Sequence, residues 1–197
     1  EFTTQVKGAT NPYYSMTSPV ALDSDLDGYL DLVYAGDTEG SVWKFYYDYQ
    51  NDVWQKVELF QTGGQPITTK LTLAFDKDGK LRLYFGTGKY IVEGDRFDSN
   101  QNAFYCLVEH KVYPGNLNDG HYTNATGIDK ANDLLDITSV KTEADYHSVL
   151  SSAQQDKVID NGWYFQLDAP TGSNPAERVF EECVGVSGAI MFTSFTP

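Results

Sequence analysis

Short apolar runs recur along the N-terminal half of the chain, and clusters of polar turn residues separate them at regular intervals. Residues 42–47, 53–60 and 70–75 are rich in Val, Leu and aromatic residues, and each has the length of a short strand. Glycine and aspartate gather between these runs, as at residues 37–40 and 78–79. This pattern is typical of an all-β sandwich or a β-propeller.

A weak internal repeat favours the propeller. Residues 19–45 and 71–90 both run through an apolar strand, an acidic turn, a second strand that ends near tyrosine, and a glycine-containing turn. Four-stranded units that repeat every ~40–50 residues are the sequence signature of propeller blades. We therefore predict an all-β fold of propeller-like blades, with residues 1–197 forming a single domain or a fragment of one.

The middle of the chain breaks this rhythm. Residues 114–162 are rich in Asn, Asp, Gly and Thr, and we predict that they form an irregular insertion with short helices. One helix is predicted over residues 129–135. A second is predicted to start from a capping box at Thr142 and to run to about residue 155. Strands resume at residues 162–167 and 189–195.

The candidate chemistry lies in residues 23–31, which we call the acidic loop. Carboxylates occupy its positions 1, 3, 5 and 9, and Gly28 occupies position 6. Calcium prefers six to eight oxygen ligands, and alternate-residue spacing aims them at one ion. Glycine allows the positive φ that such a turn needs. The predicted calcium ligands are the carboxylates of Asp23, Asp25, Asp27 and Asp31.

The acidic loop differs from an EF-hand. Position 12, where an EF-hand has its bidentate Glu, is Tyr34. Asp31 must then close the coordination shell, with the backbone carbonyl of Tyr29 as a further predicted ligand. Strand-forming residues flank the loop on both sides, so we expect it to join two strands. A solvated acidic hairpin without a metal is the alternative interpretation.

A second acidic turn offers a comparison within the same sequence. Residues 73–85 have the same order of strand, acidic turn and strand, but Lys80 takes the fifth position and Tyr84 the ninth. A cation site would not include an ammonium group among its ligands. We therefore predict that this second turn is a plain hairpin.

Charge and hydropathy narrow the range of partners. The net charge of −14 argues against nucleic acid and against anionic membranes, which both need a basic surface. The sequence contains neither a hydrophobic run long enough for a membrane span nor a recognisable signal peptide, so we expect no membrane insertion. A strongly acidic protein fits an extracellular location, where calcium reaches millimolar concentrations.

The chain has two cysteines, Cys106 and Cys183, and both have strand-like flanks. One long-range disulfide in an oxidising compartment and two buried thiols are both compatible with this pattern. The cysteine and histidine spacing does not match a zinc site.

Several segments, taken in order, resemble the C-terminal β-propeller of the PilY-type family of type IV pilus assembly and tip-adhesin proteins. One departure is Ala176, since a glycine usually precedes the Glu–Arg pair in that family. The matching segments are residues 23–31, 34–37, 40–45, 84–90, 103–105, 162–167, 177–179 and 191–197.

The resemblance implies a function for the acidic loop. In this family the loop binds calcium, and the bound state is linked to pilus extension and retraction. The implied partners are pilin or minor pilin subunits and a host or surface ligand, and the implied location is the pilus at the cell surface after secretion. A few blades alone would leave open sheet edges, so we expect either a fragment of a longer product or another chain that completes the ring.

Three classes of function follow. The leading one is a non-catalytic, calcium-binding module of a pilus-associated protein. The second is an extracellular carbohydrate- or surface-binding adhesin with purely structural calcium. Tyr46, Tyr47, Tyr49 and Trp54 would supply aromatic rings for such a surface, but packing within the blades is the favoured role for them. The third is an extracellular hydrolase that uses the acidic loop or other paired carboxylates, and it is disfavoured because four carboxylates committed to one ion do not supply the two distinct carboxylates that a glycosidase needs. We predict that the protein is not an enzyme.

Overall fold

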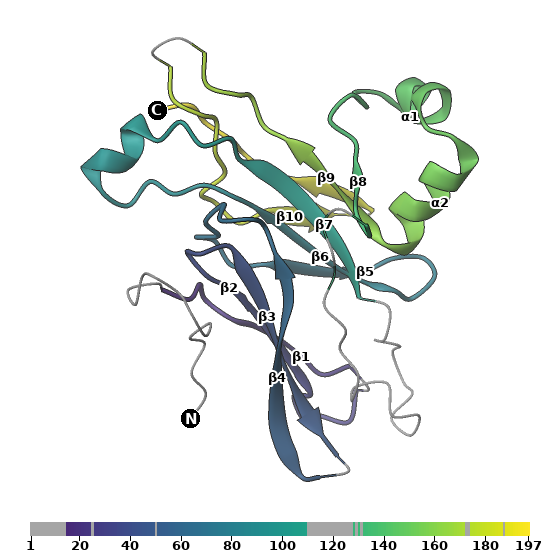
Figure 1. Ribbon diagram of the computed structural model, residues 1–197. Helices are drawn as coiled ribbons and strands as arrows, with labels where there is room; N and C mark the ends of the chain where they lie inside the picture. Colours follow the sequence, from purple (N-terminus) through teal and green to yellow (C-terminus); the bar gives the residue numbers. More distant parts are fainter. Residues whose placement is uncertain are drawn as a thin grey trace.

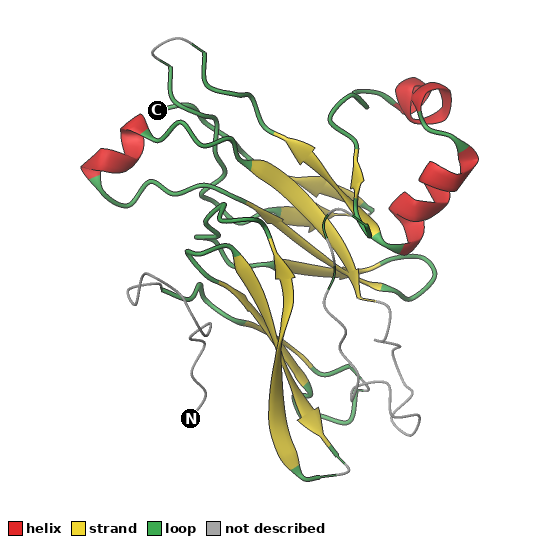
Figure 2. Cartoon of the chain, in the orientation of Figure 1, coloured by secondary structure: helices red, strands yellow, loops and turns green. Residues whose placement is uncertain are grey.

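The structure of the protein is a computed structural model, and it consists mostly of β-strands (Figures 1 and 2). Two short α-helices and one short 3-10 helix, η1 (Glu93–Phe97), accompany the strands. The structure describes residues 15–24, 26–49, 51–109, 128, 130, 132–171, 174–186 and 188–197.

The first sheet is a four-stranded antiparallel meander in the order β1-β2-β3-β4. Side chains alternate between its two faces, as strand geometry requires. Val42, Lys44 and Tyr46 of the third strand share one face, and Trp43, Phe45 and Tyr47 share the other. The strands are β1 (Val20–Leu22), β2 (Leu32–Gly36), β3 (Ser41–Asp48) and β4 (Val53–Gln61).

The second sheet has five strands in the order β5-β6-β7-β9-β8. The first four are antiparallel, and the edge strand β8 runs parallel to β9. Gly162 opens β9 with a φ of +116°, and a Cβ there would lie 2.2 Å from the backbone oxygen of Cys106. Glycine is required by this close approach. The strands are β5 (Thr72–Phe75), β6 (Leu81–Gly86), β7 (Ala103–Glu109), β8 (Leu135–Asp136) and β9 (Gly162–Gln166).

The main core lies between the two sheets. β7 is buried along its whole length, which explains why its sequence is almost continuously apolar. Its odd-numbered residues face the first sheet, where Phe85 stacks on Tyr105 and Phe60 meets both rings edge-on. The buried residues of this core are Leu32, Tyr34, Val42, Leu59, Phe60, Ile67, Leu71, Leu81, Leu83, Phe85, Ala103, Tyr105, Leu107 and Leu134.

A smaller core covers the opposite face of the second sheet. Phe104 of β7 stacks on Phe192, with ring centroids 4.1 Å apart, and Leu167, Val179 and Cys183 complete the cluster. The C-terminal segment, yellow in Figure 1, supplies this cover and includes a hairpin of β10 (Val184–Val186) and β11 (Ala189–Met191). The C-terminal segment is therefore packed on the sheet through aromatic and aliphatic side chains.

The two α-helices lie beside β8 and β9 (Figures 1 and 2). The predicted capping box at Thr142 is confirmed, because its hydroxyl accepts a hydrogen bond from the backbone N–H of Asp145 at 3.1 Å. The predicted single helix is nevertheless divided, because Leu150 turns inward and Ser151 caps a new helix. The two are α1 (Glu143–Val149) and α2 (Ser152–Asp160).

The helix predicted over residues 129–135 is wrong for the residues that the structure describes. Leu134 is buried in the main core, and Leu135 begins the strand β8, which pairs with Trp163 and Tyr164. Packing of Leu134 and pairing with β9 outweigh the weak helical preference of this short stretch. Asp129 lies outside the described residues.

The predicted β class is confirmed, and every predicted strand contains strand residues. In the part of the chain that the structure describes, the two larger sheets and the C-terminal hairpin are separate and do not close into a ring. The described helices are all too short or too polar to cross a membrane.

Candidate functional site

The acidic loop connects β1 to β2, as the strand-forming flanks predicted. Asp31 donates its backbone N–H to the carbonyl of Leu22 at 3.1 Å, which closes the base of the loop. Within it, Leu26 has a φ of +64° and Gly28 a φ of +95°. These left-handed positions curl the backbone, and at Gly28 the absence of a Cβ removes the steric cost.

Asp23 and Asp27 shape the loop through backbone hydrogen bonds. The two carboxylate oxygens of Asp23 accept the N–H groups of Leu26 at 2.7 Å and Gly28 at 2.9 Å. Asp27 accepts the N–H of Tyr29 at 2.8 Å. An ionised carboxylate has about four acceptor positions, so these hydrogen bonds are compatible with coordination of a cation by the same group.

Asp31 points inward and is the most buried of the loop carboxylates that the structure describes, with 1% of its surface exposed. One oxygen accepts both the backbone N–H and the hydroxyl of Ser24, each at 2.8 Å. The other accepts the hydroxyl of Tyr49, which follows β3. Asp31 therefore ties the two ends of the loop to each other and to the next strand.

The structure describes four of the five predicted ligand residues. Asp25 lies outside the described residues, and among the others no group of three or more His, Cys, Asp or Glu side chains is arranged to hold a metal ion. Tyr29 is on the exposed side of the loop. The donor chemistry of Asp23 and Asp27, hard anionic oxygen close to a turn with positive φ, fits calcium. Calcium binding stays a prediction.

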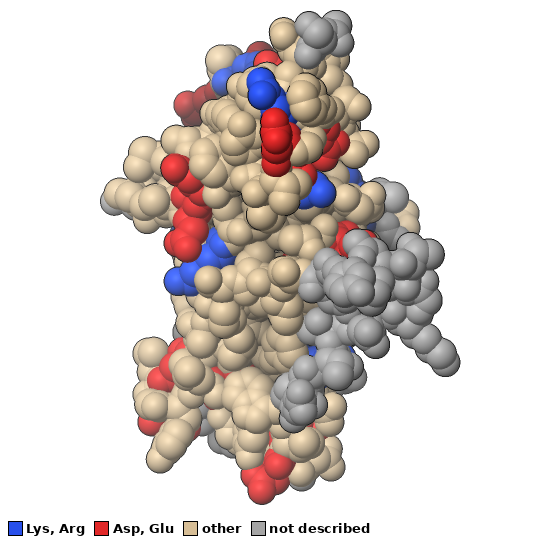
Figure 3. All heavy atoms as spheres, turned by 90° about the vertical axis from the view of Figure 1, so that its left-hand side faces the viewer, with Lys and Arg blue, Asp and Glu red and all other residues tan. Residues whose placement is uncertain are grey.

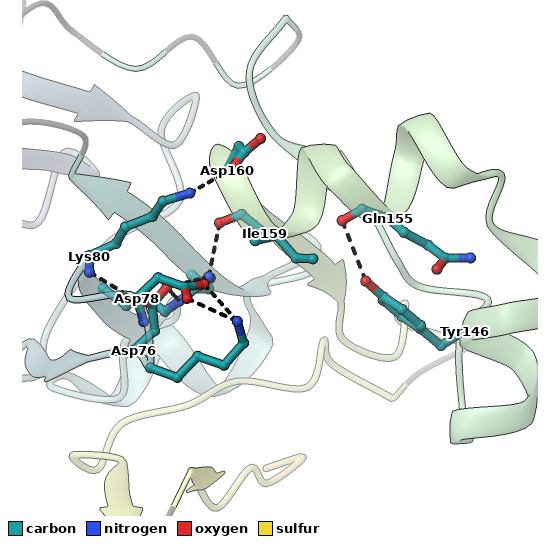
Figure 4. A network of polar contacts seen from close by, with 10 residues as sticks. Asp76, Asp78, Lys80, Tyr146, Gln155, Ile159 and Asp160 are labelled. Carbon is teal, nitrogen blue, oxygen red and sulfur yellow. Dashed lines mark hydrogen bonds and ion pairs between the residues drawn. The ribbon is translucent and has the colours of Figure 1, made fainter.

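The second acidic turn is neutralised by basic side chains (Figure 4). Asp76 accepts two hydrogen bonds from the Arg82 guanidinium, at 2.9 and 3.0 Å, while Lys80 pairs with Asp160 at the end of α2. Burial alone would raise the pKa of Asp76, but hydrogen bonds from the Lys80 N–H and from Arg82 lower it below its ordinary value. The prediction of a plain hairpin agrees with this arrangement.

A pocket of about 400 Å³ lies beside the acidic loop. We call it the aromatic pocket. The Tyr47 ring meets Tyr49 at a centroid distance of 5.0 Å and an angle of 82°, and it meets Trp54 at 5.7 Å and 67°. Tyr47 also donates its hydroxyl to Asp52, and this hydrogen bond raises the pKa of Tyr47. The pocket is lined by Asp27, Tyr29, Leu30, Tyr47, Tyr49 and Trp54.

This end of the molecule is acidic. Residues 21–34 and 45–55 together contain six aspartates and no lysine or arginine. On the face shown in Figure 3, the red side chains at the lower end, where β3 and β4 form their hairpin in Figure 1, have few blue neighbours. The sequence placed the four loop aspartates here, but the participation of Asp48 and Asp52 depends on the pairing of β3 with β4.

Comparisons with known proteins show which proteins the chain resembles. No family model matches the chain. Two type IV pilus biogenesis factor PilY1 homologs of Xylella fastidiosa are 24% and 22% identical to it, over 88% and 94% of this chain. PilY1 of Pseudomonas aeruginosa is 23% identical over 98% of the chain. The crystal structure of the Pseudomonas aeruginosa PilY1 C-terminal domain superposes with a TM-score of 0.67, at 18% identity over 98% of the chain.

The chain is similar to the PilY1 type IV pilus biogenesis factors in sequence and to the PilY1 C-terminal domain in fold.

It spans only a part of its PilY1 relatives. The matched regions cover 14%, 13% and 20% of the lengths of these three relatives, and 47% of the solved PilY1 C-terminal domain. The resemblance inferred from the ordered segments is thus confirmed, and the fold is that of the PilY1 C-terminal domain.

One segment shared with the PilY1 family has a structural role that the sequence did not reveal. The Arg178 backbone forms an antiparallel β-bridge with Phe195. Its fully buried guanidinium donates to the backbone carbonyls of Lys89, Asp95 and Asp98, at 2.8, 2.7 and 3.2 Å. It thereby fixes the loop that contains η1. Long-range contacts of this kind leave no local signal in a sequence.

The two cysteines of this PilY1 relative are buried, separate thiols. Of the two arrangements that the sequence left open, the structure has the thiol form. Burial raises the pKa of Cys106 to about 11, although the Arg82 guanidinium lies 3.8 Å from its sulfur and acts in the opposite direction. The Cys106 thiol is therefore protonated at neutral pH.

Proposed function

We propose that this chain is a non-catalytic part of a type IV pilus biogenesis factor and that its acidic loop binds calcium. The observation that carries the calcium proposal is the loop geometry: a closed β1–β2 connection with positive φ at Gly28 and with Asp23 and Asp27 folded back on its backbone. Asp23, Asp25, Asp27 and Asp31 and the carbonyl of Tyr29 are the proposed ligands. Similarity to PilY1, named as a type IV pilus biogenesis factor, supports the role in pilus biogenesis.

The comparison between the two acidic turns supports the assignment. Asp76 in the second turn is neutralised by Arg82, whereas residues 21–34 of the sequence contain four aspartates and no lysine or arginine. Bringing four carboxylates together costs electrostatic free energy, which a divalent cation would offset. Calcium in the extracellular medium is abundant enough to fill even a weak site.

We also propose that the protein works as part of a larger assembly. We place the protein at the cell surface, associated with the pilus, with pilin or minor pilin subunits as partners. The two sheets would then be blades of a larger β-propeller whose other blades come from outside these residues, from a longer product or from another chain. The exposed apolar side chains of Val184, Val186 and Met191 on the C-terminal hairpin support this arrangement.

Calcium titration followed by thermal unfolding tests the proposal. Calcium that binds only the native protein should raise Tm with concentration, and EDTA should reverse the rise. Asp27→Ala should abolish the calcium-dependent part of Tm. Asp78→Ala, which removes an exposed aspartate from the second turn, is the matched control and should keep it. A parent protein whose Tm does not respond to calcium would contradict the proposal.

A further inference from the structure

The rings of the aromatic pocket do not lie in one plane. Tyr49 and Trp54 both meet the Tyr47 ring edge to face, at 82° and 67°, so the three rings present faces in more than one direction. Tyr29, from the acidic loop, adds a further wall and is 75% exposed. Coplanar rings on an open surface suit the stacking of a sugar ring, whereas walls at steep angles surround a compact group on several sides.

The electrostatics of this pocket favour a cation. The faces of aromatic rings carry negative potential and attract ammonium and guanidinium groups within about 6 Å of the ring centroid. Tyr47 and Tyr49 donate their hydroxyls to the carboxylates of Asp52 and Asp31, which increases the electron density on both rings. Asp27 lies at the pocket as a direct carboxylate contact for a positive group.

The two lysines of the same hairpin occupy other positions. Lys44 is on the core-facing side of β3, where its ammonium lies 3.0 Å from Glu109. Lys56 on β4 lies over the ring of Trp43, 5.4 Å from the centroid. Among the residues that the structure describes, the six that line the pocket carry acidic, aromatic or aliphatic side chains. The pocket volume of about 400 Å³ is large enough for an arginine side chain from outside.

We propose that the aromatic pocket binds a basic side chain, arginine or lysine, that a partner protein presents on an exposed segment. The strongly acidic surroundings would attract such a segment, and the ring walls together with Asp27 would hold the cationic group. This site differs from the proposed calcium site in its ligand and in its three aromatic walls Tyr47, Tyr49 and Trp54, although both sites include Asp27 and Tyr29. The two can be tested separately, because EDTA keeps calcium from the acidic loop while the peptide is titrated.

The test uses acetyl-glycyl-arginyl-glycinamide as the probe, with its neutral citrulline counterpart as the control ligand. Binding is followed through the indole NMR signal of Trp54, in EDTA at low salt. We expect the arginine peptide to shift this signal saturably and to bind about fivefold or more tightly than the citrulline peptide. The titration is then repeated with calcium in place of EDTA. A change in the Trp54 signal on addition of calcium alone reports on the acidic loop, whereas the titration in EDTA decides whether the pocket binds the peptide.

Variants connect the binding to the pocket. Tyr29→Ala should weaken the arginine peptide about threefold or more, and Asp27→Asn should weaken it without affecting the citrulline peptide. Phe97→Ala is the matched control, because Phe97 is equally exposed, at 74%, and belongs to η1. Equal affinity for both peptides, unchanged affinity in Tyr29→Ala, or a Trp54 response to neutral monosaccharides but not to the arginine peptide would overturn the proposal.

Discussion

Lys44 of β3 and Glu109 of β7 form an ion pair across the interface between the two sheets, with 3.0 Å between ammonium nitrogen and carboxylate oxygen. Only 1% and 5% of their side-chain surfaces are exposed. The two residues are 65 positions apart in the sequence. Their pairing therefore couples the first sheet to the second inside a core that is otherwise apolar.

Removing one partner of this pair should be far more costly than removing both. Lys44→Met leaves the Glu109 carboxylate buried without its cation, and we expect the free energy of unfolding to fall by about 3–5 kcal/mol. Urea unfolding of Lys44→Met, Glu109→Leu and the double variant measures this coupling. The double variant should recover most of the loss, and additive losses in the two single variants would contradict the interpretation.

Asp31 and Asp27 should differ in how much they contribute to the free energy of unfolding when no calcium is bound. Asp31→Asn weakens the contacts that join Ser24, Tyr49 and the loop ends, so we expect it to lower the free energy of unfolding by about 1–3 kcal/mol even in EDTA. Asp27→Asn affects an exposed carboxylate and should change the free energy of unfolding by less than about 0.5 kcal/mol under the same conditions. Urea unfolding in EDTA separates the two, and equal effects would contradict an inward, structural role for Asp31.

The second turn should make stability depend on pH through Asp76. Its folded-state pKa is lowered, so the unfolded chain binds the proton more tightly. The resulting stabilisation is fully present above the unfolded pKa, about 4, and is lost as pH falls through the folded pKa. We expect Asp76→Asn to reduce the free energy of unfolding at neutral pH by about 1–2 kcal/mol. We also expect it to make the acid limb, the fall of this free energy as pH decreases below about 4, shallower.

Urea unfolding between neutral pH and about pH 2 measures this limb. Asp78→Asn removes a carboxylate from the same turn without disturbing the Arg82 contacts and serves as the control. An acid limb of the same slope in Asp76→Asn and in the parent protein would show that Asp76 does not contribute to the pH dependence.

Local sequence patterns predicted the strands well, because the apolar residues of a buried strand are themselves the pattern that predicts it. The apolar run that became β7 and the capping box at Thr142 are both read within a few positions of the chain. The positive φ at Gly28 was predictable for the same reason, since only local sterics decide it. The helix prediction over residues 129–135 failed where packing of Leu134 against another sheet outweighed local preference.

By itself the sequence determined the β class, the order of strands and the position of an acidic turn at residues 23–31. Only the tertiary structure decided that Asp31 faces Ser24 and Tyr49, that Arg178 holds the carbonyls around η1, and that Tyr47, Tyr49 and Trp54 form a pocket beside the loop. The physical reason is the distance along the sequence over which each kind of interaction acts. Propensity and turn chemistry act over neighbouring residues, whereas partners that meet across sheets are chosen by packing and burial of the whole chain.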